Sequence, residues 1–323
     1  MAIVSGTGIR TTFKGQRESL HNSIFRISPE RVPFSSAAGV GPKAKSITEE
    51  WQTDALAAAD GTNAQLEGDD TSFSTPAATV RVGNIAQILN KSVILSDTLE
   101  DLDYAGRKSA LAFEVMKRGK EIKRDWETVL LRSQAGASGS STVARTLAGL
   151  NSWVKTNESV GTGGVAPVYT SGVPGAVRTD GTQRAFTETI AKAVIQSGYT
   201  AGAEMNTIMV GPYNKTVFSS FSGQVTRNFD QSNVSPSPTA VIASADVYVS
   251  DFGTLRVIPN LFQRERDAWF LDFGMVETRF LRALKVKKLG KSGDAEKRLM
   301  VMEGTLIVKQ EAGLGIAADL NVS

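Results

Sequence analysis

Residues 78–96, ATVRVGNIAQILNKSVILS, form nearly twenty residues of strand-like sequence. A strand in a globular protein typically has about 5 or 6 residues, so this ribbon is too long for an ordinary sheet. Val80 and Val82 alternate with polar residues, which predicts one apolar face. After Gly83 the apolar parity changes to that of Ile85. A glycine at such a change is typical of a β-bulge, so we expect the ribbon to bend at Gly83.

The preceding segment supplies a partner for the ribbon. Residues 45–58, KSITEEWQTDALAA, have the alternation of a strand, and residues 59–76, ADGTNAQLEGDDTSFSTP, are polar and rich in turn formers. Seven acids and no Lys or Arg lie between Ser46 and Pro76. We therefore predict one long hairpin over residues 43–96, with an acidic tip and an apolar side that a partner buries. Its predicted contact residues are Trp51, Asp54, Glu67, Asp69, Asp70, Val80, Val82 and Ile85.

A long helix is predicted directly after the ribbon. Asp97 can cap it while Glu100 occupies the third helical position, as in a capping box. Apolar residues from Tyr104 to Leu130 recur at spacings that fit one helical face, and no proline interrupts the segment before Ser133. At about 1.5 Å per residue, such a helix is a rod of roughly 50 Å.

The first half of this helix is basic, with seven bases and two acids between residues 107 and 124. A solvated face remains one explanation of such a charge run. The other is an acidic partner, and the chain itself contains one in the hairpin tip. The hairpin cannot easily fold back over the helix that it leads into, but a second copy of it could reach there, in the head-to-tail manner that builds rings or lattices. The predicted contact residues on the helix are Arg107, Lys117, Arg118, Lys120, Lys123 and Arg124.

The remaining sequence divides into an N-terminal arm and two further regions. Residues 1–42 lack a sustained period and predict an extended arm. Residues 143–280 alternate short helices and strands, including a helix from Thr182 to Ser197 that Gly198 is expected to end. Residues 281–323 predict a hairpin that turns at residues 290–293.

Two long stretches interrupt the 143–280 region, and stretches of that length are often functional. They are the glycine-rich residues 161–181 and the serine-rich residues 222–238. The predicted fold class is α+β, with residues 97–142 as the helical region.

Composition narrows the chemistry. The 323-residue chain has no cysteine and one histidine, His21, which lies in the arm. Thiolate chemistry is therefore excluded, and neither a histidine relay nor a histidine-based metal site has a scaffold. We predict no catalytic residue, cofactor or metal, and no membrane-spanning segment. The net charge of +3 is too small by itself to indicate a nucleic-acid-binding protein.

Several pieces of the sequence, in their joint order, resemble the major capsid proteins of tailed phages with the HK-97-like fold. They are PFSSAAGVGPKAKSITEEW (33–51), DALAAA (54–59), EGDDTSFS (67–74), AGRKSALAFEVMKRGKEIKRDWE (105–127), DGTQRAFTE (180–188), MVGPYNKTVFSSF (209–221) and EGTLIVK (303–309). In this family the order is N-terminal arm, extended loop, spine helix, peripheral domain and axial domain. The resemblance assigns residues 1–42 to the arm, 43–96 to the extended loop, 97–142 to the spine helix, 143–280 to a mixed α/β axial domain and 281–323 to the peripheral strands.

The resemblance implies a capsid subunit that is not an enzyme. Copies would form pentamers and hexamers that tile an icosahedral or elongated shell around genomic DNA, with the extended loop lying across an adjacent subunit. The implied partners are further copies of the chain, a portal protein, and scaffolding or decoration proteins, with weak and nonspecific proximity to DNA and no membrane. The implied location is the virion capsid, and the host cytoplasm during assembly.

A second hypothesis is a nucleic-acid-binding protein that uses the basic helix 107–124. It predicts a monomer or small oligomer whose affinity for DNA falls steeply with salt.

Overall fold

The computed structural model describes residues 24, 26–68, 70, 73, 75–221, 247–291 and 293–323. His21 and most of the predicted arm lie outside these residues, as do Asp69 and the serine-rich stretch 222–238. The helices are α1 Pro33–Ala37, α2 Asp97–Asp101, α3 Ala110–Leu131, α4 Glu188–Thr200 and α5 Pro212–Ser219, with short 3-10 helices η1 Leu150–Ser152, η3 Phe273–Met275 and η4 Glu311–Gly313. The strands are β1 Thr48–Thr53, β2 Val80–Ile85, β3 Gln87–Ser96, β4 Asn157–Ser159, β5 Tyr169–Thr170, β6 Val173–Pro174, β7 Thr207–Val210, β8 Val247–Ser250, β9 Gly253–Pro259, β10 Ala268–Leu271, β11 Val276–Leu289, β12 Ala295–Val308 and β13 Gly315–Ala317.

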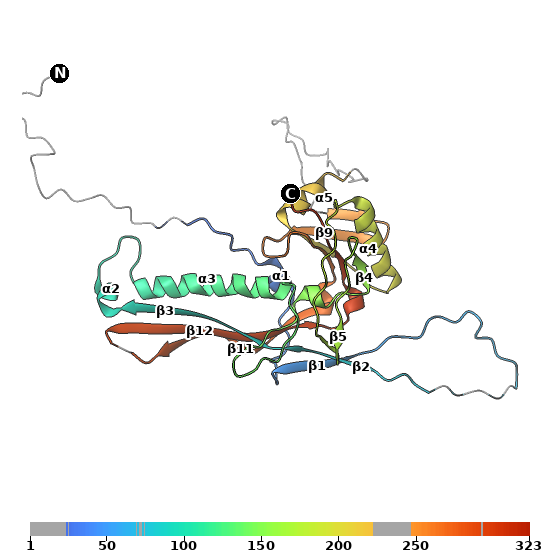
Figure 1. Ribbon diagram of the computed structural model, residues 1–323, viewed down its shortest axis with the longest axis horizontal. Coiled ribbons are helices and arrows are strands. Elements are labelled where there is room, and N and C mark those ends of the chain that lie inside the picture. Colours follow the sequence, from blue (N-terminus) through green and yellow to red (C-terminus); the bar gives the residue numbers. More distant parts are fainter. Residues whose placement is uncertain are drawn as a thin grey trace, which may run out of the picture.

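One half of the molecule is an elongated layer of sheet and helix. Its three-stranded sheet has the order β11-β12-β3, with β12 antiparallel to both neighbours. Helix α3 runs along one face of this sheet (Figure 1). Ile122 and Trp126 of α3 are buried in the same core cluster as Met302 and Leu306 of β12. The predicted hairpin over the C-terminal part is confirmed as β11–β12, with Gly293 at a positive φ of 70° in its turn.

The predicted long hairpin is confirmed as β1 paired antiparallel with β2, but its bend is not at Gly83. The register is continuous through Gly83, which lies opposite Glu50. The strand is interrupted instead at Ala86, where the chain stops pairing with β1 and begins to pair with β12. Gly83 has a different role, because its N–H donates to the carbonyl of Gly172 at 3.1 Å and a Cβ there would crowd Glu50.

The predicted continuous helix from Asp97 to Ser133 is wrong. The chain forms the five-residue α2, then a non-helical turn with Gly106 at a φ of 77°, and then the 22-residue α3. Helix α3 is therefore about 33 Å long rather than roughly 50 Å. Ser96 and Ser109 cap the two helices, and the Glu100 carboxylate accepts the backbone N–H of Leu111 in the first turn of α3 at 2.8 Å.

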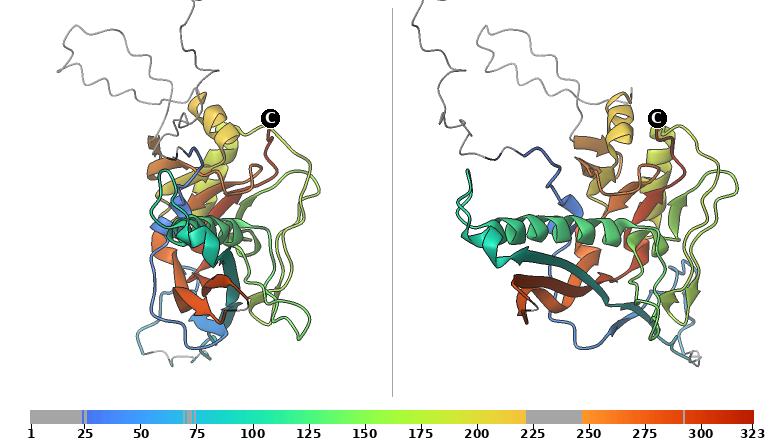
Figure 2. Two further views of the ribbon diagram at one scale, coloured as in Figure 1. Left: turned by 90° about the vertical axis from the view of Figure 1, so that its left-hand side faces the viewer. Right: turned by 60° about the vertical axis from the view of Figure 1, so that its left-hand side comes forward.

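The other half of the molecule is built on a six-stranded sheet of order β4-β13-β10-β7-β9-β8. β7 is parallel to β9 and β13 is parallel to β4, while the other neighbours are antiparallel. Helices α4 and α5 lie beside this sheet (Figure 2), and a second core cluster joins Val194 and Phe218 of these helices to Ile208 of β7. The division of the chain into domains stays a prediction. Strand β13 belongs to the region 281–323, which was expected to supply peripheral strands, but it lies in this six-stranded sheet.

The helix predicted over Thr182 to Ser197 begins and ends later than expected. It starts at Glu188, where the Thr187 hydroxyl accepts the N–H of Ile190, and it continues through Gly198 to Thr200. Gly198 does not end the helix. A glycine is needed at this position for packing, because a Cβ there would overlap the Met205 side chain. The turn follows at Gly202, which has a φ of 84°.

The mixed architecture agrees with the predicted α+β class. No helix in the described ranges is long and apolar enough to cross a bilayer.

Candidate functional site

The base of the hairpin packs against its own chain. The Trp51 ring lies 5.4 Å from the Trp153 ring, and Trp51 is opposite Val82 in the β1–β2 ladder. Val82 and Ile85 are buried. These two residues were predicted to contact a neighbouring subunit, and that prediction is wrong, because β12 and β6 of the same chain already lie against β2.

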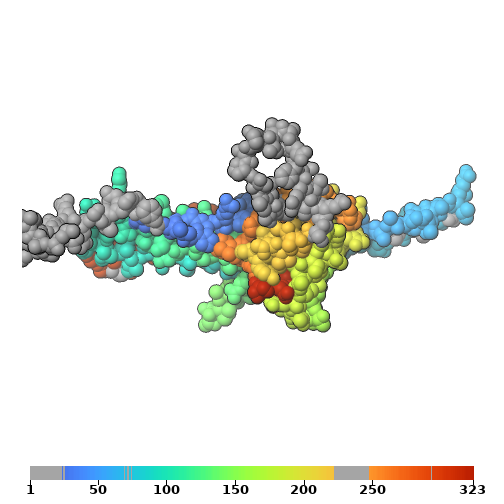
Figure 3. Space-filling model, turned by 90° about the horizontal axis from the view of Figure 1, so that it is seen from above, coloured from blue at the N-terminus to red at the C-terminus, as the bar shows by residue number. Residues whose placement is uncertain are grey.

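The hairpin tip, residues 54–79, is different. Its described residues project away from the rest of the molecule, at the end opposite α3 (Figures 1 and 3). Asp54, Glu67 and Asp70 are exposed there, and Val80 at its edge is 60% exposed. These residues remain predicted contacts, whereas Asp69 lies outside the described residues.

The tip also exposes large apolar side chains that the prediction did not include. Leu56 is 99%, Leu66 80% and Phe73 95% exposed. Beside them, the Thr62 hydroxyl and N–H donate to the Asp60 carboxylate at 2.6 and 2.8 Å and lower its pKa. The tip therefore combines ionised carboxylates with apolar groups that its own chain leaves in solvent.

The basic residues of α3 are mostly paired within the chain. Lys117 lies 3.7 Å from Glu114, and Arg118 lies 2.7 Å from Glu121. Lys120 donates to Glu30 of the arm at 2.7 Å, and this hydrogen bond lowers the pKa of Glu30.

Of the other three predicted helix contacts, two also have a partner within the chain. The Arg107 guanidinium is 4.1 Å from the centre of the Tyr104 ring, and Arg124 donates to the Pro29 carbonyl at 3.4 Å. Lys123 is exposed and has no ion pair among the residues that the structure describes. As a receptor for an acidic partner, α3 is therefore weaker than its composition indicates.

A second basic surface was not among the predicted contacts. An open groove of about 540 Å³ lies beside β11, lined by apolar side chains and by Lys43, Lys285 and Lys287. We call it the β11 groove. In the sequence, the lysines at 285 and 287 on the predicted C-terminal hairpin indicated a basic surface. The groove itself could not be predicted, because it forms only where residues 40–43 lie beside β11.

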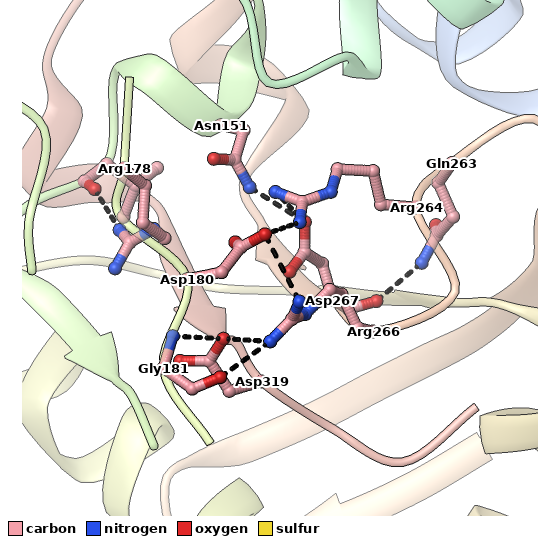
Figure 4. Close-up of polar contacts among 10 residues, drawn as sticks. Asn151, Arg178, Asp180, Gly181, Gln263, Arg264, Arg266, Asp267 and Asp319 are labelled. Carbon is pink, nitrogen blue, oxygen red and sulfur yellow. Dashed lines mark hydrogen bonds and ion pairs between the residues drawn. The ribbon is translucent and has the colours of Figure 1, made fainter. Parts of the chain in front are cut away.

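A buried polar cluster lies where β10 begins and β13 ends, at one edge of the six-stranded sheet (Figure 4). Asp267 is fully buried, accepts a hydrogen bond from the Asn151 amide at 2.7 Å and lies 3.7 Å from Arg264. Burial raises the pKa of Asp267 to about 6, although Arg264 opposes the shift. Its Oδ1 has no hydrogen-bond partner in the described part of the chain.

The same cluster fixes the glycine-rich stretch 161–181. The Asp319 carboxylate accepts the backbone N–H groups of Gly161 and Gly181, at 3.0 and 2.9 Å, and pairs with Arg266 at 2.7 Å. Arg264 and Arg266 both reach Asp180, at 2.6 and 3.1 Å. Because Arg264, Arg266 and Asp319 flank strands of the sheet, these contacts hold the glycine-rich stretch against it. Among the described residues no group of three or more metal-ligating side chains occurs.

Comparisons with known proteins cover nearly the whole chain. A family model described as SU10 major capsid protein matches residues 5–321. The curated major capsid protein of Escherichia phage Phieco32 is 28% identical over 326 residues, which cover 90% of each chain.

Solved structures agree on the fold. The capsid asymmetric unit of cyanophage A-1(L) matches with a TM-score of 0.67 and 11% identity, over 98% of this chain and 99% of that one. A chain from the capsid of a native GTA particle matches with a TM-score of 0.65 and 14% identity, over 97% and 98%. The predicted HK-97-like fold class is confirmed, and these matches do not support the nucleic-acid-binding alternative.

Proposed function

The chain belongs to the SU10 major capsid protein family and is a phage major capsid protein, a component of the virion capsid. We propose that its copies assemble into pentamers and hexamers through the projecting hairpin tip. These capsomers tile an icosahedral or elongated shell around genomic DNA. The family is a structural one and not an enzyme family.

The observation that carries the proposal is the exposure of the tip. Leu56 and Phe73 are almost fully exposed on a loop that extends beyond its own domain, and exposed apolar groups of this kind mark protein–protein contact sites. A second copy that covers them gains about 25 cal/mol per Å² of apolar surface removed from water. Because the tip and the surface that receives it are different parts of the chain, the contact is head-to-tail and can close into rings.

Other partners follow from the role of a shell subunit. A portal protein and scaffolding or decoration proteins bind the assembled or assembling shell, and assembly takes place in the host cytoplasm. Contacts with packaged DNA are weak and nonspecific, since tight binding to the shell wall would hinder packaging and ejection. The chain's small net charge of +3 fits this.

Expression of the full chain, followed by size-exclusion chromatography and electron microscopy, tests the proposal. Rings or shells of uniform size are expected. A monomer that binds DNA with an affinity that falls steeply with salt would favour the alternative instead. A variant in which residues 55–78 are replaced by a short glycine–serine linker should keep the circular dichroism of a folded subunit and lose assembly. Unchanged particles from this variant would contradict the role of the tip.

A further inference from the structure

The tripeptide Asp-Gly-Thr occurs twice in the chain, at residues 60–62 in the hairpin tip and at residues 180–182 in the glycine-rich stretch. No other aspartate and no asparagine is followed by glycine. An aspartate before a glycine is open to an internal reaction, in which the glycine nitrogen attacks the side-chain carboxyl carbon, Cγ. Glycine hinders this attack least, because it has no Cβ and its backbone is the most freely rotating. The structure places the two tripeptides in opposite settings.

The second tripeptide is held by contacts within the chain. The Gly181 N–H donates to the Asp319 carboxylate at 2.9 Å, and the Asp180 carboxylate pairs with Arg264 at 2.6 Å (Figure 4). A Cβ on Gly181 would lie 2.6 Å from the Gly161 carbonyl oxygen, so the backbone is closely packed at this point. Both reacting groups are therefore engaged elsewhere.

The first tripeptide leaves the same groups free. Asp60 and Gly61 are exposed, and the Gly61 N–H has no hydrogen-bond partner in the part of the chain that the structure describes. A Cβ on Gly61 would meet no atom within 4 Å. Rotation about two bonds of Asp60, Cα–C and Cα–Cβ, is therefore enough to bring the Gly61 nitrogen to Cγ.

Thr62 slows the reaction at this site. Its hydroxyl and its N–H donate to the Asp60 carboxylate at 2.6 and 2.8 Å, and such hydrogen bonds favour the ionised form. Attack on Cγ needs the neutral carboxyl group, because one carboxyl oxygen leaves as water. Near neutral pH the reaction therefore proceeds over the lifetime of a subunit rather than during its folding.

We propose that Asp60 and Gly61 form a self-modification site, at which Asp60 is converted to isoaspartate and a subunit that stays unassembled loses its competence to assemble. The Gly61 nitrogen forms a bond to Asp60 Cγ, and its proton leaves with the carboxyl OH as one water molecule. The product is a five-membered succinimide ring, whose closure is favoured because both groups belong to neighbouring residues. A water molecule then opens the ring. Opening at Cγ restores aspartate, and opening at the main-chain carbonyl carbon gives isoaspartate.

The conversion changes the shape of the hairpin tip. In isoaspartate the chain continues through the side chain, which adds one carbon atom to the main chain between Asp60 and Gly61. Leu56 and Leu66, which are 99% and 80% exposed, lie on either side of this point, so their relative position changes. This consequence rests on the proposed role of the tip in assembly. A neighbouring copy that covers the tip restrains its backbone, and we expect assembled copies to react more slowly.

Uptake of oxygen from solvent tests the site directly, because each ring opening places one solvent oxygen atom in residue 60. The unassembled full chain is incubated in water enriched in heavy oxygen, digested with trypsin in ordinary water and analysed by mass spectrometry. Trypsin releases residues 46–81 and residues 179–184 as separate peptides, so both tripeptides are measured in one sample. Fragmentation should locate the heavy oxygen at Asp60, with at least about tenfold less at Asp180. Equal uptake at the two sites, or none at Asp60, would overturn the proposal.

Gly61→Ala is the matched variant. It keeps the Asp60 carboxyl group and places its Cβ in open space. The variant should take up heavy oxygen about tenfold more slowly, because a side chain restricts the approach of the nitrogen to Cγ. Unchanged uptake would mean that the oxygen enters residue 60 by another route, which would overturn the succinimide.

Ageing before assembly tests the consequence. Each chain is stored below the concentration at which it assembles, and its yield of particles is compared with that of its own fresh sample. The yield should fall for the unaltered chain in step with its uptake of heavy oxygen, and it should fall much less for Gly61→Ala. An equal loss from both chains would overturn the link to assembly. Failure of the fresh unaltered chain to assemble would contradict the proposed function instead, and oxygen uptake would still decide whether Asp60 is modified.

Discussion

The Glu127 carboxylate of α3 accepts a hydrogen bond from the side-chain amide of Asn260, with 2.8 Å between Oε1 and Nδ2. The same carboxylate accepts the backbone N–H groups of Phe34 and Ser35 at the start of α1, each at 2.7 Å. Glu127 is fully buried. One side chain therefore joins the end of the arm, the helix of the elongated layer and the loop after β9.

Glu127→Ala should lower the free energy of unfolding of the unassembled subunit by about 3 to 5 kcal/mol, because three donors, two of them fully buried, lose their acceptor together. Denaturant unfolding followed by circular dichroism measures this. Thr128→Ala, at the exposed neighbouring position, should change the free energy by no more than about 0.5 kcal/mol. Equal effects of the two changes would mean that Glu127 does not join these segments.

Val82→Asp should destabilise the subunit itself, by about 3 kcal/mol or more, because it places a carboxylate in the core. Val80→Asp, two residues earlier on β2 and 60% exposed, should leave the unfolding free energy nearly unchanged. Thermal unfolding of the two purified subunits compares them. If both fold equally well, β2 is not buried against its own chain.

The outcome at these two valines shows what local sequence can predict. The hairpins β1–β2 and β11–β12 were predictable, because alternation and turn residues lie within the paired segments themselves. The burial of Val82 was not predictable from local sequence. Val82 pairs with Trp51 in the ladder, and Trp51 packs against Trp153, which lies about a hundred residues later in the chain. An exposed strand and a covered one have the same alternation.

The basic helix illustrates the same limit for charge. Its net charge was evident, but Lys120 is paired with Glu30 from the arm, and that pairing exists only in the fold. Its length was overestimated because the interval between Tyr104 and Leu111 fits a helical repeat, whereas Gly106 adopts a positive φ there. Composition therefore indicated a receptor surface on α3, where most of the predicted basic residues have a partner, whereas three lysines without an ion pair in the described part of the chain line the β11 groove.

The pH dependence of stability should contain a contribution from Asp267. Burial raises its folded-state pKa to about 6 from an ordinary value of 3.8, so between these values the folded state binds more protons than the unfolded state. Stability from this group is fully present below the unfolded pKa and is lost as the pH rises through about 6. The resulting decrease in the free energy of unfolding is about 3 kcal/mol.

Asp267→Asn should remove this contribution, because the amide oxygen still accepts from Asn151 and no charge develops. The difference in unfolding free energy between the variant and the unaltered subunit should therefore increase in favour of the variant between pH 4 and pH 7. Asp101→Asn, at an exposed position, is the matched control for the removal of one carboxyl group from the chain. A flat difference for Asp267→Asn would show that this carboxyl titrates normally in the folded subunit.

Two glycines in the 161–181 stretch separate backbone strain from close packing. Gly163 and Gly172 have almost the same positive φ, 82° and 81°, a region that costs an L-residue about 1 kcal/mol. A Cβ on Gly163 would meet open space, whereas one on Gly172 would overlap the Arg81 carbonyl in β2. Gly172 also accepts the N–H of Gly83 at 3.1 Å.

Gly163→Ala should therefore cost only about 1 kcal/mol of unfolding free energy. Gly172→Ala should cost clearly more and should raise amide hydrogen exchange at Gly83, because the stretch must move away from the base of the hairpin. Equal costs with unchanged exchange would mean that the contact between Gly172 and β2 does not hold the hairpin in place.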